Sequence, residues 1–174
     1  MAYKDLDPQR KLTALAMDIM KHNEFCRLGG LAGVGRQLVK PGVPTAGTDG
    51  RDTWWGEAFL QSLTRKQARY VFAHELYHKA LRHCMEYKGL WKQNARCANM
   101  AADYVVNQLI EDMDPPFQFV ERPTSPAPLI DPKYKGWSTV QVFRDLCQQQ
   151  DKKNGGGKAG DSGDAGAMDE HVMG

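Results

Sequence analysis

The chain of 174 residues is long enough for one domain of about 100–150 residues and a short extra segment. Charged residues make up 25% of it and hydrophobic residues 41%, which excludes both a disordered chain and an integral membrane protein. No stretch approaches the roughly 18 uninterrupted apolar residues of a membrane-spanning helix, and residues 1–5 contain no apolar signal segment. We therefore expect a cytoplasmic protein without a membrane partner. The net charge of +2 provides no argument for a nucleic-acid partner, and none is expected.

The four cysteines lie too far apart for the common cysteine metal sites. Successive cysteines are at least thirteen residues apart, so no Cys-x-x-Cys pair exists and a cysteine zinc ribbon is excluded. In a cytoplasmic protein we expect them to be reduced, half-buried thiols. The four positions are Cys26, Cys84, Cys97 and Cys147.

The composition changes abruptly after Gln150. Residues 151–174 are rich in Gly, Ala and Asp and contain almost no side chains that a core would bury. We therefore divide the chain into a domain over residues 1–150 and a flexible tail or linker over 151–174. The tail carries one histidine, His171.

The first third of the domain predicts one helix and one hairpin. Residues 5–22 place apolar side chains on one stripe opposite charged ones, which is the spacing of an amphipathic helix. Residues 25–60 contain too many Gly and Pro for a long helix. Within them, Asp49-Gly50 predicts a tight turn, because both residue types tolerate the positive φ that such a turn requires. We expect Thr53-Trp54-Trp55 to form the second strand of this hairpin.

Two capping boxes mark helix starts in the rest of the domain, at Thr64-x-x-Gln67 and Ser138-x-x-Gln141. Together with the hairpin, these helices predict an α+β fold in which helices cover a small, mostly antiparallel sheet. The expected segments are a helix from Thr64 to about His83 that closes near Gly89, a helix over 91–112, a Pro-rich crossing over 115–132 and a helix over 138–150.

The most informative motif is His74-Glu75-Leu76-Tyr77-His78 on the first of these helices. Each helical residue advances about 100°, so His74 and His78 lie about 40° apart and one turn from each other. Two imidazoles in this arrangement can bind one zinc ion, and Glu75 can reach a water beside it. The alternative is a solvent-facing helix whose histidines only form hydrogen bonds.

The following helix offers the best third ligand, Asp103. This carboxylate lies among small and β-branched apolar residues, where burial is costly unless a cation faces it. Asn99 and Asn107 share its face and could orient the carboxylate. Ala101 and Ala102 would allow this helix to approach the first one closely. The alternative is that the Asn-Asp-Asn stripe hydrogen-bonds the upstream Gly-rich loop.

His83 is the less favoured ligand. On a continuous helix it lies about 140° from His78 and about 180° from His74, so it faces away from both. No Gly or Pro intervenes to break the helix. We therefore expect His83 to act as a partner of the helix C-terminal dipole.

Four segments together resemble the putative metallopeptidase domain of the VWA-like predicted metallopeptidase family, a zincin group of bacteria and phages. The resemblance covers roughly residues 5–150 and keeps the order of the elements. It implies a zincin-like fold with an HExxH active-site helix and a following ligand-bearing helix. The four segments are Thr45–Arg51, His74–His78, Ala101–Asn107 and Leu129–Tyr134.

The motif and the resemblance together predict zinc-dependent hydrolysis of peptide bonds in a peptide or protein substrate. In this hypothesis His74, His78 and Asp103 hold one Zn²⁺, and Glu75 is the general base. We expect the substrate to add by edge pairing alongside the Thr53–Gly56 strand. Candidates for the group that stabilises the oxyanion are Tyr77, Tyr104 and His83.

A rival hypothesis is a non-catalytic, zincin-like adaptor or binding module. The resemblance favours a partner such as an AAA+ ATPase, since relatives are often encoded beside such ATPases. Members of the family usually carry a von Willebrand factor A-like domain after a flexible linker, and the composition of residues 151–174 is that of such a linker. A third hypothesis is that the tail carries His171 back to the zinc and inhibits the enzyme.

Overall fold

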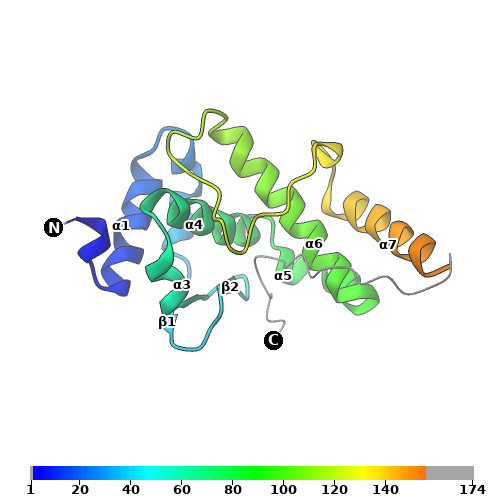
Figure 1. Cartoon of the computed structure of the whole chain (residues 1–174), viewed down its shortest axis with the longest axis horizontal. Helices are drawn as coiled ribbons and strands as arrows, with labels where there is room; N and C mark the ends of the chain where they lie inside the picture. Colours follow the sequence, from blue (N-terminus) through cyan, green and yellow to red (C-terminus); the bar gives the residue numbers. More distant parts are fainter. Residues whose placement is uncertain (1, 156–174) are drawn as a thin grey trace.

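The computed structural model describes residues 2–155, which form an α+β fold with seven α-helices and one three-stranded sheet (Figure 1). Three short 3₁₀ turns complete it. In chain order the elements are η1 (Tyr3–Asp5), α1 (Pro8–Lys21), η2 (Phe25–Leu28), α2 (Gly29–Ala32), β1 (Gln37–Lys40), β2 (Ala46–Thr48), β3 (Thr53–Gly56), α3 (Glu57–Ser62), α4 (Arg65–Ala80), α5 (His83–Glu86), α6 (Lys88–Met113), η3 (Pro132–Tyr134) and α7 (Thr139–Gly155).

The sheet is mixed, and β3 is its central strand. The predicted hairpin is confirmed: β2 pairs antiparallel with β3, and the Asp49 carboxylate accepts hydrogen bonds from the turn amides of Arg51 and Asp52. β1, however, runs parallel to β3 on its other side. The prediction of a mostly antiparallel sheet was therefore wrong, because the chain crosses from one edge of β3 to the other between β1 and β2. The expected substrate pairing along Thr53–Gly56 is also wrong, since both edges of β3 are occupied.

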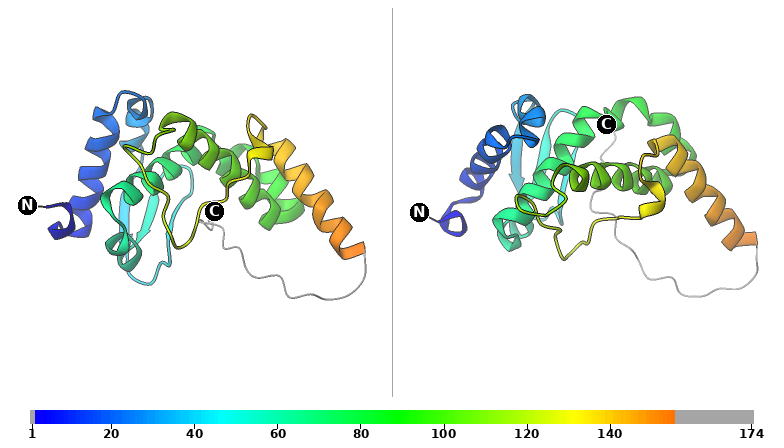
Figure 2. Two further views of the ribbon diagram at one scale, coloured as in Figure 1. Left: turned by 45° about the horizontal axis from the view of Figure 1, so that its top comes forward. Right: turned by 90° about the horizontal axis from the view of Figure 1, so that it is seen from above.

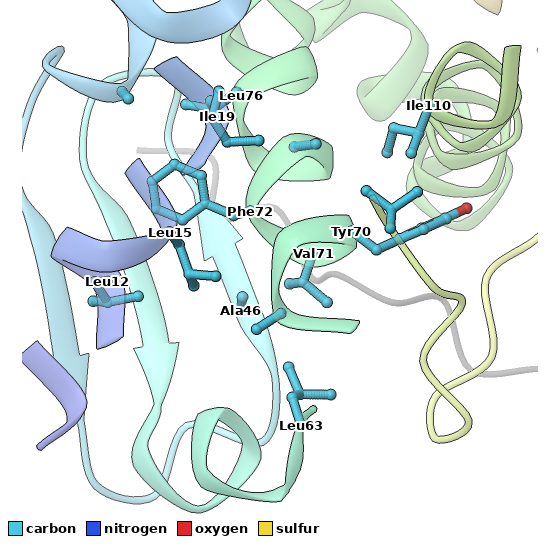
Figure 3. Packing of buried hydrophobic residues seen from close by; sticks show 14 of the residues in the cluster. Leu12, Leu15, Ile19, Ala46, Leu63, Tyr70, Val71, Phe72, Leu76 and Ile110 are labelled. Carbon is cyan, nitrogen blue, oxygen red and sulfur yellow. The ribbon is translucent and has the colours of Figure 1, made fainter. Parts of the chain in front are cut away.

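Two hydrophobic clusters form the core of the described residues. The larger one joins α1, α3, α4 and the sheet, and Figure 3 shows Leu15, Phe72 and Ile110 among its members. The smaller one joins α6 to α7. α6 contributes to both clusters and contacts both α4 and α7 (Figure 2). α6 is therefore held firmly beside α4, and this pair of helices carries the candidate site.

The helices begin where the capping boxes predict, but α4 ends earlier than expected. The side chain of Thr64 accepts a hydrogen bond from the backbone amide of Gln67, and the side chain of Gln67 accepts one from the backbone amide of Thr64. Ser138 and Gln141 form the same pair of hydrogen bonds before α7. α4 stops at Ala80 instead of about His83, because Arg82 takes the left-handed conformation with φ 54°. The next helix, α6, starts at Lys88 and contains a kink at Asn94.

Gly56, at the end of β3, lies where two backbone segments approach so closely that there is no room for a side chain. Its amide donates to the Thr45 carbonyl at 2.7 Å, and a Cβ atom here would overlap the carbonyl oxygen of Val43. We expect Gly56→Ala to lower the free energy of unfolding by about 1–3 kcal/mol, measured by urea denaturation. Gly89→Ala is the matched control, because Gly89 is exposed in α6 and its Cβ would meet open space. Equal midpoints for the two variants would contradict this close approach.

No helix in residues 2–155 is long and apolar enough to cross a membrane. α7 continues to Gly155, five residues into the segment that composition assigns to the linker. The prediction about His171 falls outside the described residues, and the division of the chain at residue 150 stays a prediction.

Candidate metal centre

The middle of α4 places the His74–His78 motif in the protein interior. The Thr64 capping box begins this helix, and eleven of its 16 residues are buried. The two imidazoles lie one turn apart, with their Nε2 atoms 2.9 Å from each other, and neither side chain has exposed surface. The alternative of a solvent-facing helix is therefore wrong.

α6 brings a carboxylate to the same place. Asp103 Oδ1 lies 3.6 Å from His74 Nε2 and 3.4 Å from His78 Nε2, and Asp103 is also fully buried. The neighbouring alanines also contribute to a hydrophobic cluster. Ala101 and Ala102 pack in the cluster with α7, whereas larger α6 side chains belong to the cluster that contains α4. These two alanines therefore pack where α6 meets α7.

The three ligand atoms fit around a single ion. They all lie within 4.8 Å of one another, and no other group of three His, Cys, Asp or Glu side chains in residues 2–155 meets this condition. The point in the plane of the three atoms that is equidistant from them is about 1.9 Å from each, so an ion slightly above this plane would have the bond lengths of about 2.0–2.2 Å that zinc forms with nitrogen and oxygen. A buried carboxylate also favours a cation beside it. His74, His78 and Asp103 could therefore hold a metal ion.

Asn107, one turn beyond Asp103, orients His74. Its Nδ2 donates to the Leu129 carbonyl at 3.1 Å, so its Oδ1 is the atom that lies 2.9 Å from His74 Nδ1. Because an amide oxygen only accepts, His74 Nδ1 carries the proton and its Nε2 lone pair faces the candidate ion site. The same amide ties the Pro-rich crossing to the site.

Asn99, the second amide of the Asn-Asp-Asn stripe, forms a hydrogen bond within α6. Asn99 Oδ1 accepts a hydrogen bond of 2.6 Å from Trp91 Nε1 within α6. We expected both amides to orient the Asp103 carboxylate. In the structure, Asn107 instead hydrogen-bonds the imidazole of His74, and Asn99 hydrogen-bonds the indole of Trp91.

His83 lies against His78 and not on the far side of a continuous helix. Its Nδ1 is 2.9 Å from His78 Nδ1, and its Nε2 is 3.1 Å from Thr139 Oγ1 at the start of α7. It is not one of the three side chains that surround the candidate ion position. The expected role at the C-terminus of α4 is wrong, because α4 ends at Ala80 and the left-handed turn at Arg82 makes His83 the first residue of α5.

Glu75 is adjacent to the first histidine and is 2% exposed. It does not belong to the group that could hold the ion, as a general base requires. Lys79 follows it by one turn and donates to the Val34 carbonyl at 3.0 Å. Burial lowers the pKa of Lys79, while the charge of Glu75 acts in the opposite direction. A cation therefore lies in the electrostatic environment of Glu75, which the sequence did not lead us to expect.

A family model with the description "Putative metallopeptidase domain" matches residues 8–172. The chain belongs to this family. The predicted resemblance to a metallopeptidase family is thus confirmed, whereas its VWA-like detail stays a prediction. Comparisons with curated proteins and with solved structures give no match.

In this domain, the three side chains considered for the oxyanion all have other contacts. The Tyr77 hydroxyl donates to Met113 Sδ, and burial raises its pKa. Tyr104 packs edge-on against Tyr134 with ring centroids 4.8 Å apart. His83 contacts His78 and the α7 terminus, as described above. Which of the three, if any, stabilises an oxyanion stays a prediction.

Two residues beside the candidate metal site could not be assigned from the sequence. Thr139 contributes a hydroxyl from 56 residues beyond His83, and no local pattern predicts such a pairing. Asn107 was noticed because it lies one turn from Asp103. Its actual partner, His74, is 33 residues away and becomes evident only once α4 and α6 are packed together.

Proposed function

We propose that this chain is a zinc-dependent metallopeptidase of the HExxH type that hydrolyses peptide bonds in peptides or proteins. His74, His78 and Asp103 would hold one Zn²⁺, leaving one position of the usual four open. The observation that carries the proposal is the placement of these three buried ligand atoms, from α4 and α6, around one point. Membership of a metallopeptidase family supports it.

A bound zinc ion would supply Lewis acidity, which activates a water molecule and polarises the scissile carbonyl. Glu75 would accept the proton of the attacking water and then deliver it to the leaving amine. Its position directly after His74 and outside the ligand group suits this role. Its low exposure also suits it, because a charge acts more strongly where little water screens it. Asn107 would keep His74 in the tautomer that presents Nε2 to the ion.

A second candidate function is a non-catalytic, zincin-like binding module with a partner such as an AAA+ ATPase. The complete burial of the three ligand side chains favours it, because structural zinc sites are closed whereas catalytic ones keep a position open. The peptidase requires the ion, whereas the binding module would use it structurally or not at all. They differ in whether a substrate reaches it.

Digestion of a peptide library by the purified chain separates the two candidates. We expect cleavage products that disappear when a chelator removes the metal and return when zinc is added. The metal content, measured in parallel by mass spectrometry, should approach one zinc per chain. Full zinc content without any chelator-sensitive cleavage would contradict the peptidase and favour the binding module. A chain that takes up no zinc would contradict the peptidase and leave only a binding module that does not use the metal.

A further inference from the structure

α5 is placed by an unusual backbone turn. Arg82, directly before it, has a positive φ of 54° although it is not a glycine, and its amide donates to the Lys79 carbonyl at 3.1 Å. Left-handed conformations of non-glycine residues are uncommon and persist where the surrounding structure demands them. Here the turn brings His83, which has no exposed surface, to 2.9 Å from His78.

The other ring nitrogen of His83 is held from a distant part of the chain. Thr139 is the first residue of α7, is 3% exposed, and places Oγ1 3.1 Å from His83 Nε2. Its position is well defined, because the Ser138 amide donates to Gln141 at 2.8 Å in the capping box and α7 packs along α6. His78, His83 and Thr139 therefore form a buried chain of hydrogen-bonding groups through three helices.

We infer that His83 is a positioning residue for the metal ligand His78 and that Thr139 positions His83. This inference rests on the proposed function, since it takes His78 as a ligand. His78 Nε2 faces Asp103 and the other imidazole, so its Nδ1 is the nitrogen that remains for a proton.

The direction of each hydrogen bond in the chain then follows. His78 Nδ1–H donates to His83 Nδ1, and His83 Nε2–H donates to Thr139 Oγ1. Both rings stay neutral with a single tautomer each. A partner that accepts from the outer nitrogen of a ligating histidine fixes its ring and increases its basicity. Each histidine ligand thus has its own partner, Asn107 for His74 and His83 for His78.

A purely structural role for His83 makes different predictions. Its ring also packs edge-on against Tyr87 with centroids 5.3 Å apart. If packing were its only role, an apolar side chain of similar size would keep the metal affinity. Removal of the Thr139 hydroxyl alone would then have no effect on the ion.

The test measures Zn²⁺ affinity by competition with a chelator in the full chain and in four variants. We expect His83→Leu to weaken binding by about 10–100-fold, as loss of such a partner does elsewhere. His83→Asn, whose Oδ1 can still accept from His78, should lose less. Thr139→Val should weaken binding measurably, whereas Thr139→Ser, which restores the hydroxyl, should stay within about twofold of the unaltered chain.

Two further measurements separate positioning from folding. The visible absorption spectrum of the Co²⁺-loaded protein reports ligand geometry, and it should change in His83→Leu and Thr139→Val but not in Thr139→Ser.

Cys84→Ala is the matched control on α5: Cys84 donates to the Thr48 carbonyl at 3.3 Å, and its loss disturbs the same short helix away from His78. We expect its zinc affinity and cobalt spectrum to be unchanged. Thermal unfolding of each metal-free variant shows which ones are folded.

The outcomes distinguish this inference from the proposed function. If the unaltered chain binds one zinc but His83→Leu and Thr139→Val bind it within about twofold of the same affinity, the inference is wrong and the metal site stands. Should His83→Leu fail to fold, the inference is judged on Thr139→Val and Thr139→Ser alone: it is wrong if both bind zinc within about twofold of the unaltered chain. If the unaltered chain binds no zinc, the proposed function fails and the inference fails with it.

Discussion

Glu75→Gln is expected to lower the rate of peptide hydrolysis by about 10²–10⁴-fold while the zinc content stays at one per chain. Glutamine keeps the shape of the side chain but cannot accept a proton from water at neutral pH. Because Glu75 lies outside the group that could hold the ion, its replacement should leave the ion in place. The rate is measured on a peptide cleaved by the unaltered chain, and the metal content by mass spectrometry.

Glu121→Gln is the matched control for this experiment. Glu121 is exposed and lies in the segment after α6, so the same chemical change there should leave both rate and metal content unaltered. Turnover by Glu75→Gln at the unaltered rate would show that another group accepts the proton. Loss of zinc from this variant would instead show that Glu75 is a ligand.

Asp103→Ala is expected to reduce the metal content to well below one per chain. The substitution removes the only oxygen of the three ligand atoms and leaves two imidazoles, so we expect zinc affinity to fall by at least about 100-fold. Equilibrium dialysis at defined free zinc concentrations measures the effect. Hydrolysis should be lost in parallel and should not return at moderate excess of zinc.

Asp112→Ala tests whether any change on α6 has the same result. Asp112 lies on the exposed side of this helix, where it pairs with Lys135 at 2.9 Å, and its loss should leave zinc binding unchanged. Full occupancy in Asp103→Ala would identify a different third ligand. The double variants with His83 and His171 replaced would then locate it.

Features that depend on neighbours within about four residues could be predicted from the sequence. The capping boxes at Thr64 and Ser138 and the Asp49-Gly50 turn are of this kind, because each is stabilised by hydrogen bonds within the motif itself. The one-turn spacing of His74 and His78 is equally local, since the helical repeat alone places them on one face.

Asp103 represents an intermediate case. Its place beside the histidines depends on how α4 and α6 pack, which no local pattern specifies. The cost of burying a carboxylate without a cation nevertheless made it the best candidate, and the structure brings it to the two imidazoles. The energetic cost of burying this carboxylate therefore identified Asp103 without knowledge of how α4 and α6 pack.

Other features could not be predicted from the sequence because they join segments that are far apart along the chain. The parallel pairing of β1 with β3, the partnership of Asn107 with His74 and the contact of His83 with Thr139 are long-range contacts of this kind. The end of α4 belongs with them: nothing near Arg82 in the sequence favours a left-handed turn. Short-range hydrogen bonding and helical periodicity sufficed to place the two histidines, whereas the groups that hold them, and the strand that occupies the second edge of β3, depend on the packing energy of the whole domain.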